Sequence, residues 1–298
     1  MIPSTTIIMS TTTNTPDSTP QAVLAISLAL YPLLFYVITP RNATPSLVAK
    51  SHEAISAVHS TLVTLLSLFE LRRNYDDWAP SRPFSSPAVH DDDIRSGDAT
   101  NGKGLKIITT RSNLGNCITA IETAYLVQDA VILILGARLR NRHAGEKDRA
   151  LVKEINWRAL VGHHIGLGTA LGILQRYIAL GREKGILVIL MLMLMNASTP
   201  IGTTHWYLVN FQPLRRRAIL LANFLYLTVY AVFRVYLVYW ILDVFGSWTG
   251  HSAIEAFRRL PLPCRMGTGT IGAANSIWLI MGVRKFMRRY TSRARASK

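Results

Sequence analysis

Seven apolar blocks, each about as long as a bilayer is thick, constrain this chain more than any other feature. A helix needs roughly 20 apolar residues to cross a hydrocarbon core of about 30 Å. Inside lipid every backbone polar group must be hydrogen-bonded within its own segment, so blocks of this length predict helices. We therefore expect an all-α, polytopic transmembrane bundle with about seven spans. The blocks lie at residues 21–38, 48–71, 115–137, 158–178, 184–202, 217–244 and 267–288.

The charge pattern predicts how the bundle is oriented. Only 17% of the residues are charged, where a soluble domain carries about a quarter. The net charge of +16 would suggest nucleic acid for a soluble chain, but here the basic residues gather in short connections such as "LRRRA" and in "GVRKFMRRYTSRARASK". Such clusters mark cytoplasmic segments. We expect a lumenal N-terminus, a cytosolic C-terminus and no nucleic-acid partner.

The same pattern predicts how the chain is divided. A Thr-rich stretch without Lys or Arg precedes the first block, so it is interpreted as a disordered tail and not as a signal peptide. The predicted segments are a disordered tail at 1–20, a first span at 21–38, a transmembrane domain at 48–290 with a polar loop at 72–114, and a basic cytosolic tail at 291–298.

Ionisable residues inside the spans are the candidates for function, because such groups are costly in a bilayer. Glu122 and Asp129 are seven residues apart, and so are His52 and His59, so each pair shares one helical face. These polar faces must point at each other or at a water-filled cavity, and not at the lipid. The sequence therefore predicts a polar spine through the bundle, to which His59, Glu122, Asn196 and Arg234 contribute.

Two adjacent histidines, His163 and His164, stand in the apolar stretch "RALVGHHIGLGTALG". Neighbouring residues point about 100° apart on a helix, so both imidazoles need partners on different faces. A working site and a structural pair both remain open, since cross-helix bonds also hold bundles together at about 0.6 kcal/mol each. The glycine spacing in "GHHIG" and "GTALG" is typical of close helix packing, and Pro200 predicts the end of the fifth span.

The order of several motifs resembles that of the TLC-domain family, named after the translocating-chain-associating, longevity-assurance and ceroid-lipofuscinosis membrane proteins. The motifs are "AISAVHSTL", "TAYLVQDAVIL", "VGHHIG", "NASTPIGTTHWYL", "FRVYLVYW" and "NSIWLIMGVRKFMRR". The resemblance implies a multi-span protein of the endoplasmic reticulum or a related membrane that makes, binds or regulates lipids. It also implies that His163 and His164 occupy the position of the paired histidines that ceramide synthases require for acyl transfer from acyl-CoA. By the same resemblance His59, Asp129 and Arg234 match the family's polar residues.

Two departures separate the chain from the ceramide synthases. Those enzymes follow the histidine pair with an acidic cluster, whereas the only carboxylate between His164 and Asp243 is Glu183. Asn196 also stands where many members of the family have a glutamate. The resemblance therefore implies a TLC-domain protein outside the true ceramide synthases.

Two functions follow as expectations. The first is a regulator of lipid homeostasis that binds a lipid or an acyl group in an intramembrane cavity. The alternative is an acyl-CoA-dependent N-acyltransferase in which His163 or His164 is the base or nucleophile and Asp129 orients it. A receptor or transporter is suggested only by the number of spans. Membrane lipids are the expected partners, acyl-CoA is a candidate substrate, no cofactor or metal is expected, and a homodimer is left open.

Overall fold

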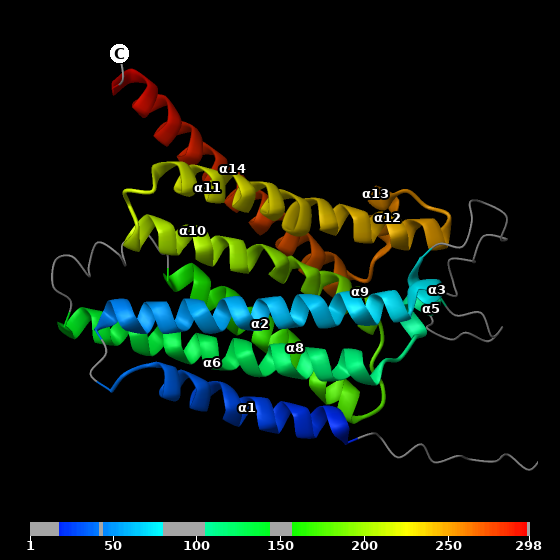
Figure 1. Ribbon diagram of the computed structural model, residues 1–298. Coiled ribbons are helices and arrows are strands. Elements are labelled where there is room, and N and C mark those ends of the chain that lie inside the picture. Colours follow the sequence, from blue (N-terminus) through cyan, green and yellow to red (C-terminus); the bar gives the residue numbers. More distant parts are fainter. Residues whose placement is uncertain (1–17, 42–43, 80–104, 144–156, 297–298) are drawn as a thin grey trace, which may run out of the picture.

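The computed structural model describes residues 18–41, 44–79, 105–143 and 157–296, and this part of the chain is built from helices joined by short connections. Figure 1 shows the long helices lying side by side along one common direction. They are α1 (Thr19–Ile38), α2 (Pro45–Arg73), α6 (Asn113–His143), α8 (Trp157–Ala179), α9 (Ile186–Met193), α10 (Thr199–Phe211), α11 (Arg216–Tyr230), α12 (Leu237–Thr249) and α14 (Leu262–Ala296). Short helices lie between them: α3 (Tyr75–Trp78), α5 (Lys106–Thr109) and α13 (Ala253–Arg259).

Five described helical segments are long and apolar enough to cross a membrane. They are Thr19–Ile38, Ser46–Arg73, Asn113–Leu135, Ile186–Phe211 and Arg216–Thr249. The two remaining predicted blocks, 158–178 and 267–288, coincide with α8 and α14, which have the length of a span but a less apolar composition. The prediction of an all-α, polytopic membrane bundle is confirmed.

The connections divide between the two ends of the bundle (Figure 1). The α10–α11 connection lies at the same end as the last residues of α6, the first residues of α8 and the last turns of α14. Helices α3, α5 and α13 lie at the opposite end. The stretches "LRRRA" and "GVRKFMRRYTSRARASK" therefore lie at one end of the bundle. Most of the predicted tail 1–20, much of the loop 72–114 and the residues 144–156 lie outside the described part of the chain.

The fifth span is longer than the sequence predicts, and the expectation that Pro200 ends it is wrong. After α9 the chain tightens into a 3-10 segment, η1 (Leu194–Ser198), and α10 then continues to Phe211. Pro200 lies in the first turn of α10. A proline is tolerated there because its missing N–H would have no partner in the first turn of a helix.

The glycines of α8 do not make the close contacts that their spacing predicts. A Cβ added at Gly162, Gly166 or Gly172 would meet no atom within 4 Å. Gly168 does face α6, but an added Cβ would lie 3.7 Å from Cβ of Leu126, which is an ordinary van der Waals distance. Close approach occurs at Gly202, where an added Cβ would lie 2.9 Å from the ring of Tyr226, so α10 and α11 approach closely at this point.

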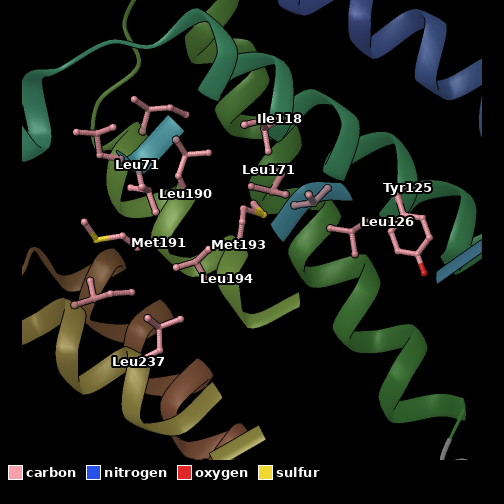
Figure 2. Close-up of a cluster of buried hydrophobic side chains, with 14 of the residues drawn as sticks. Leu71, Ile118, Tyr125, Leu126, Leu171, Leu190, Met191, Met193, Leu194 and Leu237 are labelled. Carbon is pink, nitrogen blue, oxygen red and sulfur yellow. The ribbon is translucent and has the colours of Figure 1, made fainter. Parts of the chain in front are cut away.

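The segment α9–η1 forms the apolar centre of the bundle. Leu190 and Met191 are completely buried, and Figure 2 shows them among leucines and isoleucines that come from α2, α6, α8 and α12. Burying side chains of this size gives about 1.5–3 kcal/mol each where water is the reference. This core fixes η1 beside α2 and holds Asn196 and Ser198 against the polar residues described next.

Candidate functional site

Asp129 is the point at which three helices meet through polar side chains. Its side chain is buried near the middle of α6, at 3% exposure. Nε2 of His52, on α2, lies 2.5 Å from Oδ1 of Asp129, and Nδ1 of His164, on α8, lies 2.8 Å from Oδ2. Tyr125, one turn earlier on α6, donates its hydroxyl to Oδ1 at 3.2 Å. One carboxylate therefore links α2, α6 and α8.

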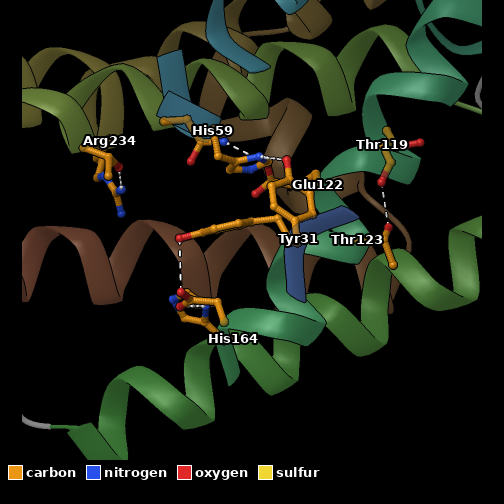
Figure 3. Close-up of polar contacts among 11 residues, drawn as sticks. Tyr31, His59, Thr119, Glu122, Thr123, His164 and Arg234 are labelled. Carbon is orange, nitrogen blue, oxygen red and sulfur yellow. Dashed lines mark hydrogen bonds and ion pairs between the residues drawn. The ribbon is translucent and has the colours of Figure 1, made fainter. Parts of the chain in front are cut away.

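Glu122 holds a second group of polar side chains two turns away on the same face of α6. Its Oε2 accepts from Nε2 of His59 at 2.8 Å and from Nδ2 of Asn196 at 3.1 Å. The other ring nitrogen of His59 lies 2.5 Å from the hydroxyl of Tyr31, which comes from α1. Figure 3 shows Tyr31, His59 and Glu122 meeting at this point. Helices α1, α2 and α6 and the segment η1 are thus joined by four side chains.

The ring of Tyr125 connects the two groups. It stacks on the imidazole of His59 with ring centroids 3.8 Å apart, while its hydroxyl contacts Asp129. The ring of Tyr31 meets the edge of Tyr125 at 5.6 Å. The two residue pairs with seven-residue spacing, on α2 and on α6, therefore face each other. His52 lies opposite Asp129, and His59 lies opposite Glu122.

The hydrogen-bonding capacity of these groups fixes which nitrogens carry protons. An ionised carboxylate only accepts, so the nitrogen that faces it must carry a hydrogen. Nε2 of His52 makes such a hydrogen bond, so Asp129 selects a proton on this nitrogen. Nδ1 of His164 lies within ion-pair distance of Asp129 but makes no aligned hydrogen bond. The carboxylate is nevertheless close enough to orient the ring of His164, as a carboxylate does for a histidine that acts as a general base.

The two remaining predicted residues, His163 and Arg234, lie beside these groups without a contact to either carboxylate in the described structure. The ring of His163 meets those of His164 and of Trp278, on α14, each at 5.6 Å between centroids. Arg234 donates from Nε to Oγ of Ser198 at 2.8 Å. It lies in a six-residue π-helical segment, η2 (Ala231–Tyr236), between α11 and α12. Such segments inside α-helices frequently occur at functional sites.

Some members of the site are not among the residues that the sequence singles out as candidates. His52 was noted only for its spacing from His59, yet its ring contacts Asp129. Tyr31 and Tyr125 carry no sequence signal, because a tyrosine in an apolar block is a common core residue. Among the described residues no group of three or more His, Cys, Asp or Glu side chains has an arrangement that could hold a metal ion.

The fold and the site together define a class: a polytopic helical membrane protein with a buried polar centre between its spans. The model of the TLC domain matches residues 51–284, which is most of the chain. The chain therefore belongs to the TLC-domain family, and this membership supports a lipid-related function in a membrane. Neither the curated proteins nor the solved structures contain a significant match to the chain. Helix α1, which supplies Tyr31, lies outside the matched residues.

Proposed function

We propose that this protein acts in lipid homeostasis by binding a lipid or acyl group at the polar centre formed around Asp129 and Glu122. The observation that carries the proposal is the buried contact of His52 and His164 with Asp129. Ionisable side chains inside membrane spans are costly and mark functional sites by default. A molecule that reaches such a site laterally comes from the bilayer, which favours a lipid as the ligand.

The residues next to the carboxylates indicate how the lipid is held. His163 is half-buried, its ring meets Trp278, and no hydrogen bond links it to another described residue. Arg234 donates to Ser198 and makes no ion pair with any described carboxylate. A polar headgroup or a carbonyl oxygen offers acceptors to both side chains, while the apolar residues of the spans accommodate the chain.

A second candidate function is acyl transfer, and one observation favours it. Nδ1 of His164 lies 2.8 Å from Asp129, so Nε2 is the ring nitrogen that remains for a substrate. In this role Nε2 removes a proton from the amine of an acceptor lipid, and the amine nitrogen attacks the thioester carbonyl of acyl-CoA. The amide forms as the C–S bond breaks, and CoA takes up the proton from Nε2 and leaves as its thiol. The acidic cluster of the ceramide synthases is absent from the sequence after His164, so we place the chain outside that branch.

The two functions share a site and differ in turnover, so one set of variants tests both. Wild type, His164→Ala and Asp129→Asn are purified, and the lipid that remains bound is identified by native mass spectrometry. Asp243→Asn is the matched control, because Asp243 is exposed at the middle of α12. We expect a long-chain lipid on wild type and control and a loss of about tenfold in both site variants, since a charge-assisted contact contributes about 1.5–3 kcal/mol.

The same proteins are then incubated with long-chain acyl-CoA and a sphingoid base while free CoA is measured. CoA release that His164→Ala abolishes would establish the acyltransferase. Bound lipid without CoA release would establish a regulator or carrier. Equal lipid retention by wild type and both site variants would contradict the proposed function. We further propose an endoplasmic-reticulum location with a cytosolic C-terminus, because the basic connections gather at one end of the bundle.

A further inference from the structure

Helix α14 runs past the end of the bundle, and its last turns are strongly basic. Figure 1 shows this helix projecting beyond its neighbours at its C-terminal end. The sequence has no Asp or Glu after Glu255. Residues 284–298 contain seven basic residues and no acidic one: Arg284, Lys285, Arg288, Arg289, Arg293, Arg295 and Lys298. The charge of this segment is therefore not neutralised within itself.

The same segment has an apolar side. Val283, Phe286 and Met287 follow the spacing i, i+3 and i+4, which places them on one face of a helix. Val283 is 42% and Met287 51% exposed, although both are apolar. Arg284, Lys285 and Arg288 are exposed as well. A helix with an exposed apolar face and a basic remainder has the character of helices that lie at a membrane surface.

A second basic segment lies at the same end of the bundle. The connection between α10 and α11 exposes 93% of Leu214, and three exposed residues, Arg215, Arg216 and Arg217, follow it. None of the three makes an ion pair with a carboxylate in the described part of the chain. This connection therefore combines an exposed apolar side chain with neighbouring exposed cations, as the C-terminal part of α14 does.

We propose that these two segments, which we call the basic end (residues 213–217 and 283–288), bind the anionic headgroups of the phospholipids that surround the protein. Lys and Arg clusters next to a membrane span attract anionic lipids, at about 1 kcal/mol per cation near the surface, or roughly fivefold in affinity. Leu214, Val283 and Met287 insert at the boundary between headgroups and acyl chains. The basic end thereby fixes the depth of α11 and α14 and enriches anionic lipid around the bundle.

Nucleic acid is the other polyanion that such a charge could attract. The observations favour lipid, because the cations alternate with exposed apolar residues that a phosphate backbone does not need. Both segments also continue directly into helices of the bundle, α11 and α14, so they lie at the level of the headgroups if the spans cross the bilayer. The charge and its position therefore match a phospholipid surface.

The experiment uses the full chain with one reporter on the apolar face of α14. Cys117 and Cys264 are replaced by alanine, Met287 is replaced by cysteine, and an environment-sensitive dye is attached to the new cysteine. The labelled protein is reconstituted into nanodiscs of phosphatidylcholine alone or with increasing phosphatidylserine. A disc exposes both membrane faces, so the result does not depend on the orientation of the bundle. We expect a blue-shifted, brighter signal as phosphatidylserine increases, and a smaller response at high salt.

The charge requirement is tested with matched triple variants. Arg284→Gln/Lys285→Gln/Arg288→Gln removes cations from the basic end. Arg72→Gln/Arg182→Gln/Lys184→Gln removes three exposed cations from the opposite end of the bundle, where α2 and α8 finish.

We expect the first variant to need far more phosphatidylserine for the same signal, by about fivefold for each cation removed. The control variant is expected to behave as wild type. Equal signals in neutral and anionic discs, or equal responses of the two triple variants, would overturn the proposal. A dye response to a single-stranded oligonucleotide in neutral discs, without a response to phosphatidylserine, would also overturn it and identify nucleic acid as the partner.

Discussion

Replacing Asp129 by asparagine removes the charge that joins three helices while it keeps the shape of the side chain. In the structure His52 and His164 both point a nitrogen at this carboxylate, from α2 and α8. Asparagine offers one acceptor oxygen and one amide nitrogen that only donates. The histidine that faces this nitrogen can form a hydrogen bond only as the tautomer that accepts, and both contacts lose the charge of the carboxylate.

The expected size of the effect follows from the number of bonds. Hydrogen bonds between helices in a membrane bundle contribute about 0.6 kcal/mol on average and about 1.7 kcal/mol at most. The substitution weakens the hydrogen bond to His52 and the ion pair to His164, and any buried nitrogen that is left without a partner adds a cost of its own. We expect Asp129→Asn to lower the free energy of unfolding by about 1–3 kcal/mol.

The assay is reversible unfolding of the purified protein by SDS in mixed micelles, followed by circular dichroism. Asp243→Asn serves as the control, because the same substitution at this exposed position on α12 should change the free energy by about 0.5 kcal/mol or less. A double-mutant cycle between Asp129→Asn and His52→Phe isolates the free energy of the contact between these two side chains. We expect a coupling energy of about 0.6–1.7 kcal/mol. A coupling below about 0.3 kcal/mol would refute the view that Asp129 joins the helices.

Three further predictions concern packing, topology and the arginine of the π-helical segment. Gly202→Ala should lower the free energy of unfolding in SDS by about 1–3 kcal/mol, because the added Cβ would lie 2.9 Å from the ring of Tyr226. The control Gly166→Ala should change this free energy by about 1 kcal/mol or less, because an added Cβ meets no atom there. Asn42, in an "NAT" sequon outside the described residues, should carry no glycan if the N-terminus is lumenal, and a glycosidase-sensitive mass shift mapped to it would invert the topology. Arg234→Lys should weaken lipid retention in native mass spectra although the charge is kept, because a single ammonium replaces the guanidinium that reaches both Ser198 and Thr199. Unchanged retention would show that Arg234 does not contribute to lipid binding.

The sequence predicts the helices well, because lipid leaves a polar backbone few alternatives. The predicted blocks at 21–38, 158–178 and 217–244 differ by only a few residues from the helices observed. The exceptions have local causes. Pro200 does not end its span, since the 3-10 turn before it removes the need for its N–H. Gly162, Gly166 and Gly172 of α8 face open space, since spacing alone does not say whether a partner helix lies opposite.

The site could be predicted in part. The seven-residue spacings place His52 and His59 on one face of α2, and Glu122 and Asp129 on one face of α6, because helical geometry alone determines this. Which histidine meets which carboxylate depends on the relative position of the two helices along their axes, and a sequence pattern does not contain it. The contribution of Tyr31 depends on the packing of α1 against α6. It could not be found from residue type.

The proposed function places a lipid acyl group beside the histidine pair, and photo-crosslinking tests this placement most directly. The protein is incubated in nanodiscs with a fatty acid that carries a photoreactive group, irradiated and digested, and the labelled peptides are sequenced with and without an excess of unlabelled lipid. We predict competable labelling of α8 and α14 around His163 and Trp278, whose rings are in contact, and loss of that labelling in His164→Ala. Labelling confined to the exposed apolar surface of α1, unchanged by competitor, would contradict a lipid site at the polar centre.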